Sequence, residues 1–165
     1  MVISSTDIKH LERCIQLAQQ ALDQGDMPFG SVLVDNNGQV LMEDHNRDNT
    51  KNKTCHPEFE IARWAAQNLN AQERALATVY TSGEHCPMCS AAHAMAGLGR
   101  IVYASSSAQF ASWYQEWGVP LSPVNHLPIK AVAPSLEVAG PVPELAEKVR
   151  TLQHRYLQKS CNKDG

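Results

Sequence analysis

Two short motifs hold residue types that together could bind a metal ion and move protons. His56 and Glu58 stand two positions apart, and Cys86 and Cys89 follow as a C-x-x-C pair that begins 30 residues after the histidine. One imidazole and two thiols are zinc ligand types, and three ligands leave the fourth tetrahedral position open, as in catalytic zinc sites. Zinc can lower the pKa of a bound water to about 7, which makes hydroxide available. Glu58 is then the expected catalytic carrier of protons.

Both motifs are predicted at the start of a helix. The first helix spans 56–69, with Pro57 in its first turn, where the missing N–H costs little. The second begins at residue 87 and runs to 95, and the glycines at 97 and 99 end it. A helix N-terminus favours thiolates through its partial positive charge. Two helix starts are therefore expected to converge on one metal ion, with the open position facing the substrate.

The rest of the chain alternates between helical and extended patterns. Apolar residues spaced 3 and 4 apart predict a helix from Ile8 to Leu22, with Ser5 or Thr6 as its N-cap and Gly25 at its end. The other expected elements are strands at 31–34 and 39–42 joined by an Asn-Gly turn, a polar loop at 47–55, strands at 77–81 and 101–104, a helix at 107–117, a last strand at 129–132 and a helix from 143. This alternation predicts an α/β layered fold.

Size, charge and cysteine content narrow the class of protein. The 165 residues fit a single domain, 1–165, with a polar tail at 159–165 that we expect to be flexible. A formal net charge of -3 argues against a broad nucleic-acid footprint. The sequence has neither an apolar run long enough to span a membrane nor a secretory signal pattern. Because five cysteines include a C-x-x-C pair beside a distant His, we expect metal binding and a cytoplasmic protein with reduced thiols.

Four segments in a fixed order resemble one known family. They are Met27-Pro-Phe-Gly, Asp44-His-Asn-Arg, His56-Pro-Glu and Thr81-Ser-Gly-Glu-His-Cys-Pro-Met-Cys. The chain resembles the cytidine deaminase-like superfamily, closest to the branch that holds guanine, cytosine and tRNA adenosine deaminases. The resemblance implies a three-layer α/β/α fold with a central five-stranded sheet, a Zn²⁺ cofactor, a homodimer and hydrolytic removal of an exocyclic amine. Two departures, Pro57 and His85, change the wall of the site and no ligand.

The resemblance also suggests residues that contact the substrate. Asn46 would hydrogen-bond the base or its sugar, although an Asn in this polar loop also suits a turn. The backbone of Glu84 would lie near the substrate amine, although an acid here equally suits a helix N-terminus. His85 either lines the pocket or points to solvent. His93 is expected to be a packed core histidine.

Aromatic residues supply a further candidate surface. Phe110, Trp113, Tyr114 and Trp117 recur at helical spacing, which is more typical of a core or subunit interface than of a stacking platform. The resembling enzymes close over the base with this region, which makes Trp113 a candidate substrate contact. Phe29 is a second candidate for packing against a flat ring.

Three functions compete. The preferred hypothesis is zinc-dependent hydrolytic deamination of a small nucleobase or nucleoside, in the manner of guanine or cytosine deaminases. The second is deamination of adenosine in tRNA. The third is a non-catalytic structural zinc module, in which His93 and Cys55 or His56 complete four ligands around the C-x-x-C pair. The sequence does not specify which ring is deaminated.

Overall fold

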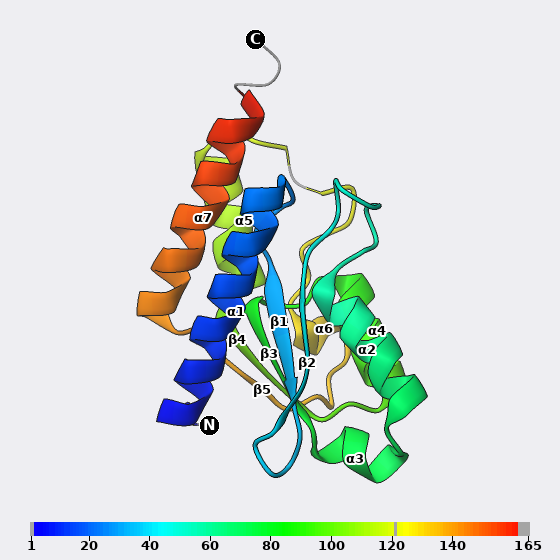
Figure 1. The fold of residues 1–165 in the computed structure, drawn as a ribbon. Helices are drawn as coiled ribbons and strands as arrows, with labels where there is room; N and C mark the ends of the chain where they lie inside the picture. Colours follow the sequence, from blue (N-terminus) through cyan, green and yellow to red (C-terminus); the bar gives the residue numbers. More distant parts are fainter. Residues whose placement is uncertain (1, 121, 162–165) are drawn as a thin grey trace.

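A five-stranded mixed sheet forms the middle layer of the protein (Figure 1). The computed structural model describes residues 2–120 and 122–161. In spatial order the strands are β2 (Val40–His45), β1 (Gly30–Val34), β3 (Thr78–Gly83), β4 (Arg100–Ser105) and β5 (Val138–Ala139). β1 pairs antiparallel with both β2 and β3, whereas β3, β4 and β5 are parallel to one another. The C-terminal ends of β3 and β4 therefore lie next to each other at the same end of the sheet.

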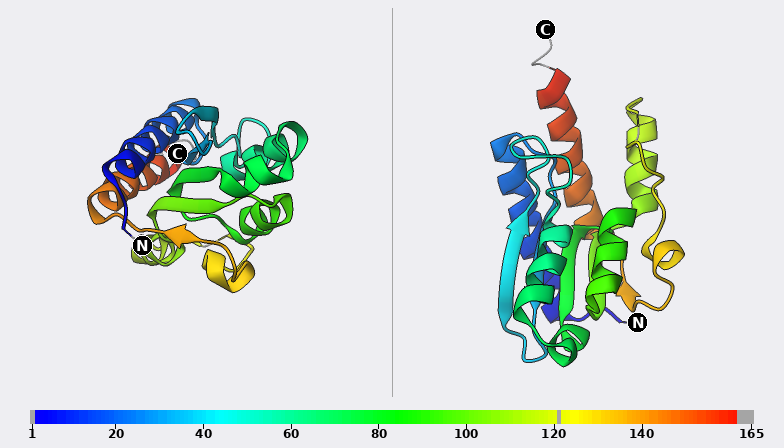
Figure 2. Two further views of the ribbon diagram at one scale, coloured as in Figure 1. Left: turned by 90° about the horizontal axis from the view of Figure 1, so that it is seen from below. Right: turned by 90° about the vertical axis from the view of Figure 1, so that its right-hand side faces the viewer.

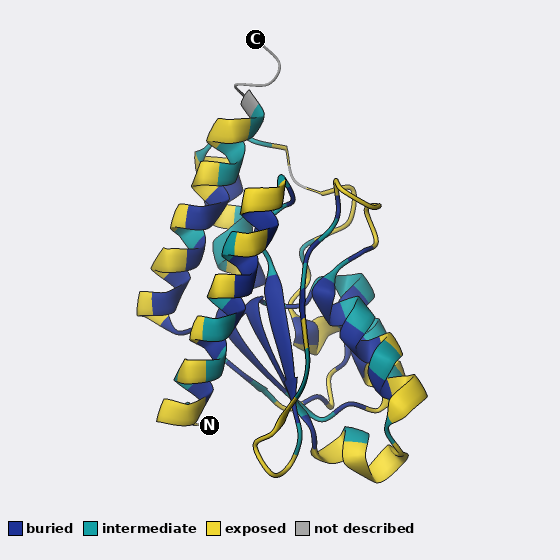
Figure 3. Cartoon of the chain, in the orientation of Figure 1, coloured by how far each residue is buried: buried dark blue, intermediate teal, exposed yellow. Residues whose placement is uncertain are grey.

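Helices cover both faces of this sheet (Figure 2). The main helices are α1 (Ser5–Gln24) and α7 (Pro143–Cys161) on one face, and α2 (Pro57–Asn68) and α4 (Pro87–Ala96) on the other. Successive strand residues alternate between the faces. Val32 and Tyr80 pack in the core beneath α1 and α7, whereas Leu33 and Val79 pack in the core beneath α2. The three central strands, β1, β3 and β4, are consequently buried on both sides (Figure 3), and the expected three-layer α/β/α fold is confirmed.

The predicted last strand at 129–132 is wrong. These residues form the short helix α6 (Ile129–Val132), and the sheet is completed by β5, where Val138 pairs with Ile101. Pro128 stands at the N-cap, and the Ile129 amide donates to a carboxylate of Glu84 instead of to a neighbouring strand. Ile129 is fully buried against β4. A short apolar run signals burial but does not by itself separate helix from strand.

Most of the other predicted elements are present with shifted ends. The N-cap of α1 is Ser4, not Ser5 or Thr6, because Ser4 forms a reciprocal capping box with Asp7. The helix α3 (Ala71–Leu76) was not predicted, although Asn70 and Glu73 form the capping box that marks its start. The predicted 107–117 helix is α5 (Ser107–Glu116).

The C-terminal helix extends into the segment predicted as a flexible tail. α7 runs to Cys161, so residues 159–161 continue the helix. The remainder of the predicted tail, 162–165, lies outside the described residues. Among the helices that the structure describes, none combines the length and apolar character needed to cross a bilayer.

Candidate active site

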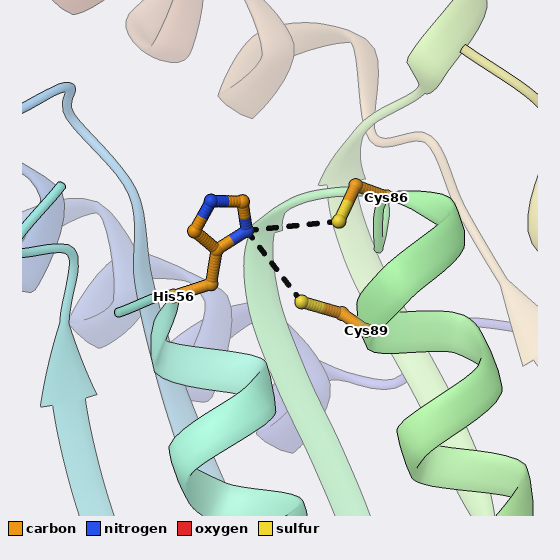
Figure 4. A group of neighbouring side chains, drawn as sticks. All are labelled: His56, Cys86 and Cys89. Atoms are coloured by element: carbon orange, nitrogen blue, oxygen red, sulfur yellow. Dashed lines mark hydrogen bonds between the residues drawn. The ribbon is translucent and has the colours of Figure 1, made fainter. Parts of the chain in front are cut away.

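The three predicted ligands converge at the starts of two helices (Figure 4). Nδ1 of His56 lies 3.6 Å from the sulfur of Cys86 and 3.6 Å from the sulfur of Cys89. His56 is the N-cap of α2 and Cys86 the N-cap of α4, and neither side chain caps its own helix. Both side chains are therefore free to turn toward each other.

The spacing of these atoms fits tetrahedral zinc. With Zn–S and Zn–N bonds of about 2.3 and 2.05 Å at a tetrahedral angle, the nitrogen and sulfur would be about 3.6 Å apart. Hydrogen bonds from Cys89 and His56 lower the pKa of Cys86 to about 4, even though burial opposes this shift. Cys86 is thus a thiolate at neutral pH, which is the form that binds metal.

Among the residues that the structure describes, no fourth protein ligand completes the set. Within residues 2–120 and 122–161, only His56, Cys86 and Cys89 form a group of three or more potential ligands close enough to share an ion. His93 is fully buried and its Nε2 lies 2.9 Å from the carbonyl oxygen of Gly99, so it is a core residue as expected. Three ligands with an open position are typical of catalytic sites, and a closed structural module would need four.

Glu58 lies beside the ligand set in a buried, polar niche. It is 6% exposed, and its Oε1 accepts hydrogen bonds of 2.8 Å from the hydroxyls of Ser31 and Thr81. These two residues face each other on β1 and β3. Burial raises the pKa of Glu58 above its usual range. Sequence reasoning missed Ser31 and Thr81, although a hydroxyl in an otherwise apolar buried strand is the signal that could have found them.

Asn46 is buried at the start of the loop that follows β2. Its Nδ2 donates to the carbonyl oxygen of Met27 (3.1 Å) and to Oδ1 of Asp48 (3.0 Å). Asp48 in turn accepts from the Met27 amide at 2.9 Å. Among the described residues, Oδ1 of Asn46 has no hydrogen-bond partner. A buried acceptor without a partner costs free energy, so a ligand or water that donates to Oδ1 would be favoured there.

Glu84 and His85 occupy the turn between β3 and α4. The Glu84 carboxylate accepts one 2.8 Å hydrogen bond from the amide of Ser107 and another from the amide of Ile129. It therefore caps the starts of α5 and α6, which agrees with the helix-terminus interpretation, and any substrate contact would have to come from its backbone. His85 is 1% exposed and packs edge-on against His93, with 5.3 Å between ring centroids. The alternative that His85 points to solvent is thus excluded.

The aromatic residues of α5 have different surroundings: Trp113 lies in the core, whereas Phe110 lies beside Phe29. Trp113 is 7% exposed and belongs to the hydrophobic core beneath α1 and α7, together with Leu11 and Val149. This placement matches the core interpretation and not the predicted substrate contact. Phe110 is half-buried and lies 5.8 Å from the ring of Phe29. Phe29 is therefore the predicted aromatic contact that remains near the site.

Comparison with known proteins identifies the family. The model of the cytidine and deoxycytidylate deaminase zinc-binding region matches residues 4–105. The chain belongs to this family. A probable cytosine deaminase of Schizosaccharomyces pombe is 32% identical over 141 residues, which cover 84% of this chain and 86% of that protein. A guanine deaminase of Bacillus subtilis is 35% identical over 102 residues, which cover 61% of this chain and 60% of that protein.

A solved structure points to a third relative of this chain. A structure from a study of tRNA:A34 deaminases has a TM-score of 0.53 at 32% identity, over 60% of this chain and 76% of that one. Membership confirms the resemblance seen in the sequence, the fold and the zinc cofactor. These relatives act on different rings, so they support deamination without selecting a substrate.

Proposed function

We propose that the protein is a zinc-dependent hydrolytic deaminase of a small amino-substituted nucleobase or nucleoside, similar to guanine or cytosine deaminases. The observation that carries this proposal is the buried carboxylate of Glu58 beside a three-ligand set with an open position. His56, Cys86 and Cys89 would hold the zinc ion.

Glu58 would move every proton in the reaction. Zinc, when bound, supplies a water whose pKa is lowered to about 7. Glu58 takes one proton from the attacking water and passes it to the ring nitrogen. It then moves the other proton of that water to the leaving amine. Water and the amino-substituted ring thus give the ring carbonyl and ammonia. Ser31 and Thr81 both donate to Oε1, which leaves Oε2 for proton transfer.

The charges around the site favour a small substrate over RNA. Phosphate binding needs clustered basic groups that are free to neutralise it. In the loop after β2, Arg47 pairs with Asp44 at 2.5 Å, and Lys53 contacts Asp48 at 3.2 Å. Two of the three basic residues in this loop, Arg47, Lys51 and Lys53, are therefore paired with this chain's own acids.

An ammonia-release screen tests this function. Aminopurines, aminopyrimidines, pterins and their nucleosides would be compared with adenosine-bearing tRNA anticodon stems, each at low and high salt. We expect turnover of one or more small rings with little salt dependence. The opposite result would be efficient deamination of the RNA that falls steeply with salt, with no ammonia release from any small ring. This result would favour a tRNA adenosine deaminase over this proposal.

The tRNA alternative stays in the screen because a tRNA deaminase structure shares 32% identity with this chain. The homodimer implied by the resemblance stays a prediction, and light scattering of the purified protein checks it. A monomeric mass at micromolar concentration would contradict it.

A further inference from the structure

Glu84 binds the starts of two helices that are distant in sequence, α5 and α6, near the metal ligands. Its carboxylate holds the first amide of α5 and the first amide of α6, and it lies two residues before Cys86. The residues that lead directly into α6 are therefore held near the turn that carries Glu84. His126 lies in this connection, three residues before Ile129, whose amide is 2.8 Å from Glu84. His126 is also close enough to Cys86 for the charge of that sulfur to act on its imidazole.

A chain of tilted ring contacts joins His126 to Phe29, the residue before β1. The imidazole of His126 lies 5.3 Å from the ring of Phe110, which lies 5.8 Å from the ring of Phe29. Phe29 in turn lies directly on the backbone of Gly83, because a Cβ added there would be 2.9 Å from its Cε1. We call Phe29, Phe110 and His126 the aromatic wall. It extends from the end of β3, three residues before Cys86, to the α5–α6 connection.

His126 contributes the polar group of this wall. Its Nε2 is buried, and among the described residues it has no hydrogen-bond partner. Burial lowers the pKa of His126, while the negative charge of Cys86 acts in the opposite direction. The imidazole is thus neutral at pH 7 and offers one donor and one acceptor. A buried ring nitrogen without a partner gains free energy when a ligand supplies one.

We infer that His126 determines substrate specificity by hydrogen-bonding a polar edge group of the heterocycle, while Phe110 and Phe29 pack against the ring. This inference rests on the proposed deaminase function. It adds a residue that lies outside the matched family region, residues 4–105. Specificity of this kind is steep, because a substrate that lacks the matching edge group leaves the imidazole nitrogen buried and unpaired.

Three variants separate hydrogen bonding from packing. His126→Phe keeps a ring against Phe110 and removes both nitrogens, whereas His126→Gln restores a polar group near the position of Nε2. His154→Phe is the matched control, since His154 stacks on Trp117 at 5.0 Å and is exposed on α7. Steady-state kinetics would be measured on guanine, cytosine, adenine and their nucleosides, together with zinc content and thermal unfolding.

We expect His126→Phe to raise KM about tenfold for the preferred ring, as the loss of one hydrogen bond would. Zinc content and kcat should change little, His126→Gln should recover most of the loss, and His154→Phe should match the wild type. The inference is overturned if His126→Phe stays within twofold of wild type on every ring. An equal KM rise in the Phe and Gln variants would overturn it too, because restoring a polar group would then recover none of the lost binding. A wild type inactive on every ring would instead refute the proposed function and remove the basis of the inference.

Discussion

The metal-ligand side and the aromatic wall of the site are built in opposite ways. The ligands stand at the first turns of two helices, each fixed by a Pro at the first helical position. Both motifs lie within the family-matched region. The aromatic wall is assembled from residues before β1, in α5 and in the connection to α6, and no single motif contains it. The difference indicates that the chemistry is encoded locally, whereas the shape of the substrate site depends on long-range contacts.

Both sides also depend on buried polar groups, but on different ones. Glu58 is held by hydroxyls of adjacent strands, within the sheet itself. The wall is held by Gln153 of α7, which is fully buried, donates to the carbonyl oxygen of Pro28 and accepts from the hydroxyl of Tyr114. Tyr114 stacks on Phe110 at 4.2 Å. The C-terminal helix therefore supports the wall, and changes there should alter substrate binding without altering metal binding.

Loss of a ligand should have the largest effect. Cys86→Ala or Cys89→Ala should abolish stoichiometric zinc and reduce ammonia release to background, because two ligands cannot hold the ion in a catalytic geometry. Metal analysis by mass spectrometry alongside the activity assay measures both. Cys55→Ser is the control, since Cys55 adjoins His56 in sequence but is not part of the ligand group. Full zinc occupancy in either Ala variant would refute the ligand assignment.

Removal of the proton carrier should separate metal binding from turnover. Glu58→Gln keeps the shape of the side chain and its contacts with Ser31 and Thr81, so zinc should stay at one per chain. The rate should fall by roughly 10²–10⁴-fold, the usual contribution of a general acid–base group. Zinc content and kcat on the preferred ring are the two measurements. A variant that keeps more than about a tenth of the rate would contradict this role.

A change in α7 tests the long-range side of the comparison. Gln153→Leu preserves volume but leaves the Pro28 carbonyl and the Tyr114 hydroxyl without partners. Unfolding free energy should fall by about 2–6 kcal/mol, since each of the two buried unpaired groups costs about 1–3 kcal/mol. The KM of the preferred ring should rise several-fold with zinc content unchanged. Chemical denaturation and kinetics check this, and an unchanged KM in a destabilised variant would show that α7 does not support the wall.

The far end of the sheet should affect stability alone. Burial would raise the pKa of Asp7, but hydrogen bonds from the Ser4 amide, Tyr80 and Arg100 outweigh it and lower that pKa to about 2. A depressed folded-state pKa means that the stabilisation is present above pH 4 and is lost as pH falls toward 2. It amounts to about 2 kcal/mol.

Asp7→Asn should remove this pH dependence and leave kcat and KM unchanged at neutral pH. Denaturation curves at pH 7 and pH 3 for the wild type and the variant measure it. The prediction fails if the two proteins lose the same stability between these pH values.

Several predictions that depend on local contacts agree with the structure, whereas several that depend on long-range contacts do not. The starts of the helices after His56 and Cys86 were predictable, because a Pro at the first helical position acts locally. The end of α4 was predictable for a similar reason, because Gly97 is its C-cap. The segment at 129–132 was not, since its helical state depends on the Glu84 carboxylate 45 residues away. Trp113 and Phe110 share one helix, and periodicity alone did not show which would face the core.

The sequence by itself determined the reaction class: the ligand types, their spacing and the acid beside them are chemical properties of single residues and short segments. Only the tertiary structure decided what surrounds that chemistry. Trp113 lies in the core, and the Glu84 carboxylate accepts hydrogen bonds from the first amides of α5 and α6. His126 lies beside Phe110. The physical reason is that ligand identity and helix caps are local, whereas burial and partner choice depend on how distant segments pack.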